Sequence, residues 1–225
     1  MKKEEIIKKI SKPSTLFRVG GLRAIDSIQA SWFGKILLCK KGEDWPSIDG
    51  NLMTPLCQIN LSNIPYKPDI IKDINFICVF IDKERIFNEE GSDSVLIRTY
   101  ENLDDLIPLR QLEYKTSIKP FQLDPYLEEN DCPCWDDCPI NIPEDFEDKY
   151  EMLFENKSGI KIGGWPTLIQ SEIFWTPFNK NAEDISFVFQ IDSIEKANWS
   201  WGNSGVGYFG KNTQTNDWSF TWQAY

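Results

Sequence analysis

Residues 187–192 read FVFQID, and residues 55–60 read PLCQIN. Each phrase contains a glutamine followed by an isoleucine within an apolar run. Each also lies downstream of a Trp-Pro pair that is followed by Ser or Thr: WPS at 45–47 precedes the first phrase, and WPT at 165–167 precedes the second. Short apolar runs bounded by Gly, Pro and Asn are typical of strands. Because the phrases recur with the same neighbours, the sequence predicts two strand-rich pseudo-repeats.

The expected fold is α+β: a single sheet-rich domain over residues 1–225, built from two pseudo-repeats with a few peripheral helices. The first pseudo-repeat spans about residues 30–100 and the second about 160–225, with an acidic loop and helix at 124–157 between them. Neither half is large enough to close a good core alone, so we expect the two to pack against each other.

The glutamine of each phrase, Gln58 or Gln190, interrupts an apolar strand and is expected to be buried. A buried amide must be hydrogen-bonded. Two interpretations follow: the side chain bridges backbone groups within the sheet, or it contacts a ligand. In the second case Gln58, Gln190 and Asp192 would form the polar lining of a cleft between the two halves.

Helical spacing occurs near the N-terminus and again in the middle of the chain. Ile6, Ile7 and Ile10 predict a helix that ends before Pro13. Phe146, Tyr150, Leu153 and Phe154 lie on one helical face after Pro143, and predict a second helix that Gly159 ends. Residues 115–142 show no periodicity and hold several prolines, so we expect a long surface loop there.

Composition excludes several classes of function. The chain has no histidine, which rules out Ser-His-Asp and Cys-His catalysis and the zinc motifs that contain two histidines. No run reaches the roughly 18 apolar residues of a membrane span, and the start, MKKEEIIKKI, lacks the apolar segment of a secretory signal. We therefore expect a cytoplasmic protein without a cofactor.

Three of the six cysteines crowd into CPCWDDCP, at Cys132, Cys134 and Cys138. Structural zinc sites use four ligands, commonly as two C-x2–4-C pairs. The spacing here is C-x-C-x3-C and no fourth soft ligand lies nearby, so we predict no metal site. These three cysteines remain the only candidates for one.

Acidic residues are concentrated between Asp124 and Glu151. Eleven Asp and Glu side chains and one lysine, Lys149, give this segment a charge of −10 (1 − 11), against −11 for the whole chain. Such a segment is either a solvated face or a docking surface for a basic partner, and it disfavours binding to nucleic acids or anionic membranes. The residues that we expect to contact a partner are Glu128, Glu129, Asp131, Trp135, Asp136, Asp137, Glu144, Asp145, Glu147 and Asp148.

Several phrases resemble the YwqG-like family of bacterial proteins, a domain of unknown function. They are KIGGWPTLIQ (161–170), FVFQIDS (187–193), WGNSGVGYFG (201–210) and WSFTW (218–222), with FGKILLCKKGEDWP (33–46) and PLCQINLSNIP (55–65) in the first half. FGK stands where a double glycine is expected. The resemblance implies an internally duplicated, sheet-rich α+β fold with no established activity, and its members are often encoded near secreted toxins.

These observations lead to one functional hypothesis and two alternatives. The first is a non-catalytic, acidic binding protein, an immunity-type inhibitor of a basic toxin such as a nuclease, present as a monomer or weak oligomer. The second is a small-ligand binder or enzyme that uses the cleft lined by Gln58, Gln190 and Asp192. The third makes residues 131–138 a metal-dependent element.

Overall fold

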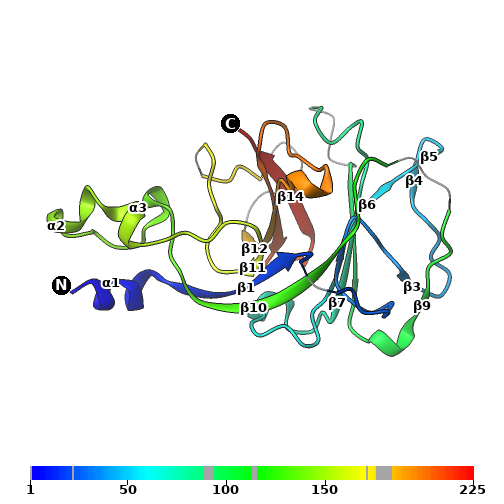
Figure 1. Cartoon of the computed structure of the whole chain (residues 1–225), viewed down its shortest axis with the longest axis horizontal. Coiled ribbons are helices and arrows are strands. Elements are labelled where there is room, and N and C mark those ends of the chain that lie inside the picture. The colour runs from blue at the N-terminus through cyan, green and yellow to red at the C-terminus, as the bar shows by residue number, and fades with distance from the viewer. Residues whose placement is uncertain (1, 22, 89–93, 113–115, 171, 176–183) are drawn as a thin grey trace.

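Ten strands form one antiparallel sheet among the residues that the computed structural model describes, namely 2–21, 23–88, 94–112, 116–170, 172–175 and 184–225 (Figure 1). They are β1 (Lys12–Val19), β2 (Trp32–Phe33), β6 (Thr54–Asn60), β7 (Phe76–Ile81), β8 (Val95–Tyr100), β10 (Phe121–Asp131), β11 (Ile160–Gly163), β12 (Ile185–Asp192), β13 (Val206–Asn212) and β14 (Trp218–Gln223). Their order across the sheet is β14-β13-β12-β11-β1-β10-β2-β6-β7-β8.

Short elements connect and cover this sheet. Two small ladders lie outside it, one made by β3 (Leu38–Lys40) with β9 (Leu106–Pro108) and one by β4 (Ser47–Ile48) with β5 (Asn51–Leu52). The described 3-10 turns are Asp69–Ile71, Leu103–Asp105, Trp135–Asp137 and Glu195–Ala197. The side chain of Asn102 accepts a hydrogen bond from the Asp104 amide and so caps the second of these turns.

The centre of the sheet comes from segments that the sequence does not mark as strands. β1 and β10 pair antiparallel from Lys12 opposite Asp131 to Val19 opposite Leu123. The expectation of a surface loop over 115–142 is therefore wrong for residues 121–131, which form the longest described strand. Most of its side chains are only partly buried, so the segment lacks the apolar alternation that identifies a half-buried strand.

The expected α+β fold of two pseudo-repeats is also wrong. The sheet is continuous from β14 to β8, and β1 and β10, which come from outside both proposed repeats, join its two halves. One hydrophobic cluster extends across both halves, including Leu56 and Val79 from the first and Phe189 and Phe209 from the second. The halves do not close as separate units because they share this core.

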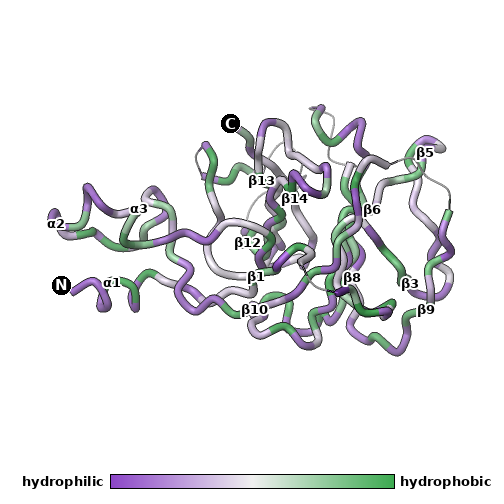
Figure 2. The backbone as a smooth tube through the Cα atoms, viewed as in Figure 1, coloured by the Kyte–Doolittle hydropathy of each residue, from purple (hydrophilic) through white to green (hydrophobic). Residues whose placement is uncertain are grey.

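The sheet curls until its two ends approach each other. The indole Nε1 of Trp222 on β14 donates a hydrogen bond to the carbonyl of Ile86, between β7 and β8, at 3.2 Å. The ring of Phe87 packs edge-on against Trp222 with 5.2 Å between centroids. Figure 2 shows hydrophobic residues along the strands of this curled sheet.

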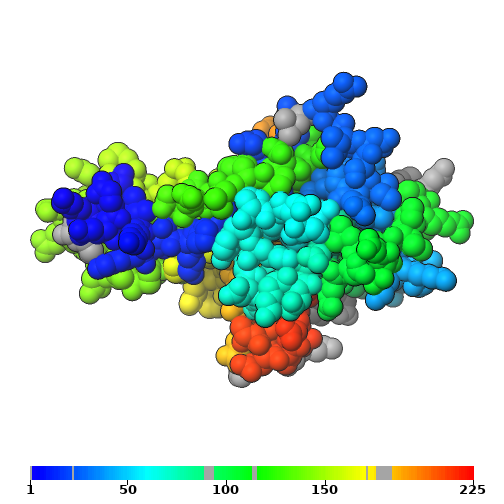
Figure 3. All heavy atoms as spheres, turned by 90° about the horizontal axis from the view of Figure 1, so that it is seen from below, coloured from blue at the N-terminus to red at the C-terminus, as the bar shows by residue number. Residues whose placement is uncertain are grey.

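Among the described residues, the α-helices lie in a lobe at one end of the molecule (Figures 1 and 3). It contains α1 (Lys3–Ile10), α2 (Glu144–Glu147) and α3 (Tyr150–Leu153), around a small core that includes Ile6, Ile10, Tyr150 and Phe154. The N-terminal helix is confirmed. The second expected helix is interrupted, because Lys149 leaves the helical region at φ −124° and ψ 12°. Within the described residues, no helix combines the length and apolar character needed to span a bilayer.

Candidate functional site

The acidic residues divide into two sets. Three of them, on β10, meet cations from other elements: Asp124 pairs with Arg18 at 3.0 Å, Glu128 with Lys157 at 3.6 Å, and Asp131 with Lys161 at 2.9 Å. Asp131 is fully buried, so it lies away from the surface that a partner could contact.

The second set consists of Glu129 on β10 and six acids of the lobe. Glu129, Asp136, Glu144, Asp145, Glu147, Asp148 and Glu151 are exposed, and among the described residues none of them has a cation within 4.0 Å. Three of these carboxylates lie in the first turn of α2, where they favour the positive end of the helix dipole. Asp137 is half-buried, and burial raises its pKa although Lys12 opposes the shift. These carboxylates therefore lack close cations, while Lys8, Lys9 and Lys149 are exposed on the same lobe.

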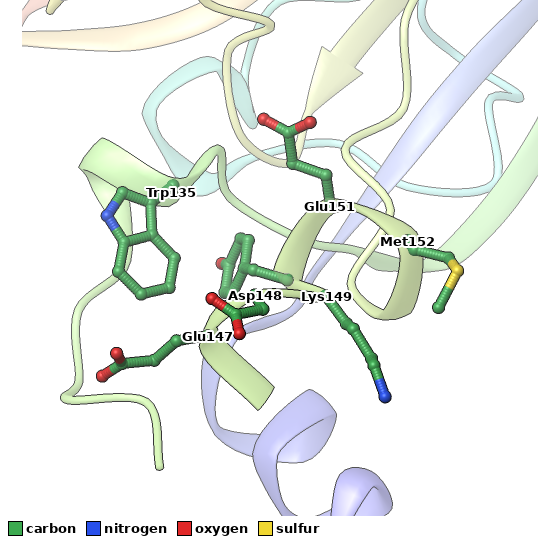
Figure 4. A pocket seen from close by; sticks show the side chains of 7 residues that line it. Trp135, Glu147, Asp148, Lys149, Glu151 and Met152 are labelled. Atoms are coloured by element: carbon green, nitrogen blue, oxygen red, sulfur yellow. The ribbon is translucent and has the colours of Figure 1, made fainter. Parts of the chain in front are cut away.

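A hollow of about 390 Å³ opens on this lobe. Its lining is Trp135, Glu147, Asp148, Lys149, Tyr150, Glu151 and Met152. Figure 4 shows Trp135 and Glu147 on one side, Lys149 and Met152 on the other, and Asp148 between them. Trp135 is 44% exposed, and its ring packs edge-on against Tyr150 at 5.1 Å, which fixes its position.

A second hollow of about 290 Å³ adjoins the first. Both are lined by Trp135 and Glu147, and the second adds Cys138, Ile140, Asn141 and Ile142. An aromatic face beside carboxylates attracts a lysine or arginine side chain by cation–π and charge-assisted contacts. The two hollows and the exposed acids around them form what we call the acidic lobe site.

The cysteine cluster adjoins this site, and Cys138 is part of the lining of the second hollow. Cys132 is buried in the lobe core, and the thiols of Cys134 and Cys138 point toward the carbonyls of Pro166 and Ile140. Burial raises the pKa of Cys132 to about 11, so its thiol stays protonated at neutral pH. In the described part of the chain, no group of three His, Cys, Asp or Glu side chains is arranged to hold a metal.

A second polar centre is hidden in the sheet, around Lys161 of β11. Its Nζ donates to Oδ2 of Asp131 at 2.9 Å and also to the carbonyl of Lys157. The Asp131 carboxylate accepts two backbone amides as well, from Lys157 at 2.8 Å and Trp165 at 2.9 Å. Burial lowers the pKa of Lys161 and raises that of Asp131, and their mutual attraction opposes both shifts.

Asp192 and Gln190 extend this centre from β12. Asp192 accepts hydrogen bonds from the Gly159 amide at 2.6 Å and from Gln190 Nε2 at 2.7 Å. Burial raises the pKa of Asp192 to about 6. Gln190 also accepts from the Thr167 amide at 2.8 Å, which anchors the segment after the Trp165-Pro166 pair. We call Asp131, Lys161, Gln190 and Asp192 the buried polar centre.

Sequence reasoning identified Asp192 and Gln190 but missed Lys161. The available signal was a lysine at the middle of the apolar run GIKIGG, a position at which a buried charge requires a partner. The sequence marks its partner, Asp131, only as one member of the acidic segment and not as a buried ion-pair partner. Gly163, the last residue of β11, and Gly164 after it both have positive φ angles, +76° and +67°. A Cβ atom on Gly164 would overlap the carboxylate of Asp131.

Gln58 bridges backbone groups on β6 in a comparable way. Its Oε1 accepts from the Leu37 amide at 2.6 Å, and its Nε2 donates to the carbonyls of Ile28 and Ala30 at 2.9 and 2.6 Å. Both Gln58 and Gln190 are fully buried, and four strands separate β6 from β12 in the sheet. The structure therefore gives each amide backbone-bridging bonds and does not bring the two glutamines together along the sheet.

Comparison with known proteins identifies a family but no activity. The family model described as "Domain of unknown function (DUF1963)" matches residues 33–215. The search of curated proteins returned no match. The matched region contains most of the sheet and the whole lobe except α1, so it includes both the acidic lobe site and the buried polar centre.

Proposed function

From the premise that this chain belongs to the DUF1963 family, we propose that it is a non-catalytic binding protein whose acidic lobe site docks a basic protein. The observation that carries this proposal is the hollow at Trp135, together with the exposed lobe carboxylates around it that have no cation within 4.0 Å among the described residues. The partner inserts a lysine or arginine side chain beside Trp135, between the carboxylates of Glu147 and Asp148.

A concentrated negative surface accelerates association with a cationic partner by roughly 10 to 1000-fold, and salt weakens this effect. An exposed, fixed tryptophan adds the kind of anchor that dominates many interfaces. The carboxylates alone would be equally compatible with a solubilising face, so the hollow at Trp135 is the feature that favours binding.

The partner class comes from the YwqG-like resemblance. Proteins of that kind are often encoded near secreted toxins, and a nuclease toxin carries the positive charge that this lobe complements. We therefore assign this chain the role of a cytoplasmic, immunity-type inhibitor. The product of the neighbouring gene is the first partner to test.

The test is co-expression with that gene product, followed by calorimetric titration of the purified pair at two salt concentrations. We expect a complex whose affinity falls at least about tenfold between about 50 mM and 500 mM salt, because the lobe carboxylates are exposed to screening. Glu147→Lys/Asp148→Lys and Asp136→Lys/Asp137→Lys should each weaken binding by at least about tenfold.

The matched control is Asp104→Lys/Asp105→Lys. These two exposed acids lie in the 3-10 turn before β9, at the end of the molecule opposite the lobe (Figure 1). The control changes net charge by the same amount, yet its affinity should stay within about twofold of the wild type if contact at the lobe matters. Equal weakening by all three double variants would show that only net charge acts and would reject the acidic lobe site.

A further inference from the structure

The ion pair of the buried polar centre, Lys161–Asp131, is completely buried. Both side chains, Lys161 and Asp131, have 0% exposure, and they come from β11 and the end of β10, with β1 between them. An isolated pair of charges in such surroundings carries a large desolvation cost. Burial therefore disfavours the charged form of each group, although their mutual attraction at 2.9 Å opposes this effect.

We propose that the side chains of Lys161 and Asp131 condense into an intramolecular isopeptide bond that cross-links β11 to β10. The reacting groups are held together by the fold, and water is excluded from around them. Fixed proximity of this kind can replace the high concentration that amide formation otherwise needs. This inference does not depend on the function proposed for the acidic lobe site.

The reaction needs no co-reactant. A proton first passes from the Lys161 ammonium to the Asp131 carboxylate, giving a neutral amine and a neutral acid, the direction in which burial shifts both pKa values. The amine nitrogen then attacks Cγ of Asp131 and forms the C–N bond. The C–O bond breaks, and the hydroxyl of Asp131 leaves with one hydrogen of Lys161 as a water molecule.

The groups around the pair suit this step. The amides of Lys157 and Trp165 donate to the two oxygens of Asp131, so they can stabilise the negative oxygen that develops during attack. Asp192, on the strand next to β11, interacts electrostatically with Lys161. Its raised pKa, about 6, suits it to accept the amine proton and return it to the departing hydroxyl.

The cross-link would close the chain at the base of the lobe. Asp131 is the last residue of β10, and Lys161 lies in the strand that returns from the lobe to the sheet. The segment between them contains α2 and α3 and most of the acidic lobe site. A covalent bond at this point would hold the base of the lobe closed even when the sheet is destabilised.

The test is the intact mass of the purified full-length chain, measured under denaturing conditions. We expect a mass lower than the sequence mass by one water molecule, and a proteolytic fragment in which the peptides of Asp131 and Lys161 are joined. A full sequence mass, or loss of water mapped to any other pair of residues, would overturn the proposal.

Three variants distinguish the Lys161–Asp131 bond from other reactions that also remove one water molecule. Lys161→Arg keeps the charge but cannot condense, so its mass should equal its sequence mass. A cyclic imide at Asp131 would still lose water in this variant, and that result would overturn the proposal. Lys157→Arg, the matched control outside the pair, should remain linked. Asp192→Asn should be unlinked; if it is fully linked, Asp192 does not transfer the proton.

Discussion

Lys161 and Asp131 are 30 positions apart in sequence, yet Nζ of the first lies 2.9 Å from Oδ2 of the second with no solvent around either side chain. This contact joins β10, after which the chain enters the lobe, to β11, with which the chain returns to the sheet. It also orients the carboxylate that receives the amides of Lys157 and Trp165. The fold at the base of the lobe thus depends on the contact between these two side chains.

Removing one member of this pair should destabilise the protein strongly. We expect Lys161→Met to lower the free energy of unfolding by about 3–5 kcal/mol, because it leaves the Asp131 carboxylate buried without its cation. Urea denaturation measures the change. The control is Lys157→Met, which removes a partly exposed ammonium that pairs with Glu128 and Glu155 and should cost no more than about 1 kcal/mol. Similar losses in both variants would contradict this account.

Gly164 should tolerate no side chain. Its φ of +67° is unfavourable for other residues, and a Cβ would overlap the Asp131 carboxylate. We expect Gly164→Ala to lower the free energy of unfolding by more than about 2 kcal/mol. Gly42 has a φ of +92° and open space around it, so it serves to distinguish the backbone cost of a positive φ from the cost of the overlap. Gly42→Ala should show only the backbone cost, about 1–2 kcal/mol, so an equal loss at both glycines would exclude the predicted overlap.

Asp192 should make stability depend on pH in the acidic range. Its pKa is about 6 in the folded state and about 3.9 in the unfolded chain, so the folded protein binds more protons between these values. Stability should therefore fall as pH rises from about 4 to 6 and level off above, by about 2–3 kcal/mol in total.

The measurement is the free energy of unfolding of wild type and Asp192→Asn across this range. The difference between the two proteins isolates the contribution of Asp192 from that of other carboxylates. The variant should lack the downward slope. A difference that stays constant from pH 4 to 7 would show that Asp192 titrates normally.

Trp135 should be an anchor for the partner of the acidic lobe site. We expect Trp135→Ala to weaken binding to the basic gene product by about 30-fold, corresponding to about 2 kcal/mol at an interface hot spot. The matched control is Phe87→Ala, which removes another exposed aromatic ring that packs on Trp199 and Trp222, and these belong to the sheet core and not to the lobe core. Calorimetric titration compares the two. Unchanged affinity in Trp135→Ala would remove the hollow from the proposed interface.

Local patterns predicted several features correctly. The apolar runs around Gln58 and Gln190 are strands, β6 and β12, and the two amides are buried and bonded to backbone, as expected of polar groups in such runs. The isoleucines of residues 6–10 form the buried side of α1. In each case neighbours in sequence were sufficient, because periodicity and capping act within a few residues.

Non-local pairing was not predictable in the same way. β10 reads as a polar, proline-containing loop, and it becomes a strand because β1, more than a hundred residues earlier, supplies its hydrogen-bond partner. The second expected helix breaks at Lys149 although Phe146, Tyr150 and Phe154 do face the lobe core. Here tertiary packing overrides the helical pattern.

The sequence by itself determined the chemical inventory of this protein: no histidine, a charge of −11, and a run of carboxylates between residues 124 and 151. Tertiary structure alone decided how those carboxylates are used. It buries Asp131 against Lys161 and leaves the lobe acids exposed around Trp135. The physical reason is that the net charge is a sum over residues, whereas desolvation and pairing depend on which strands lie side by side.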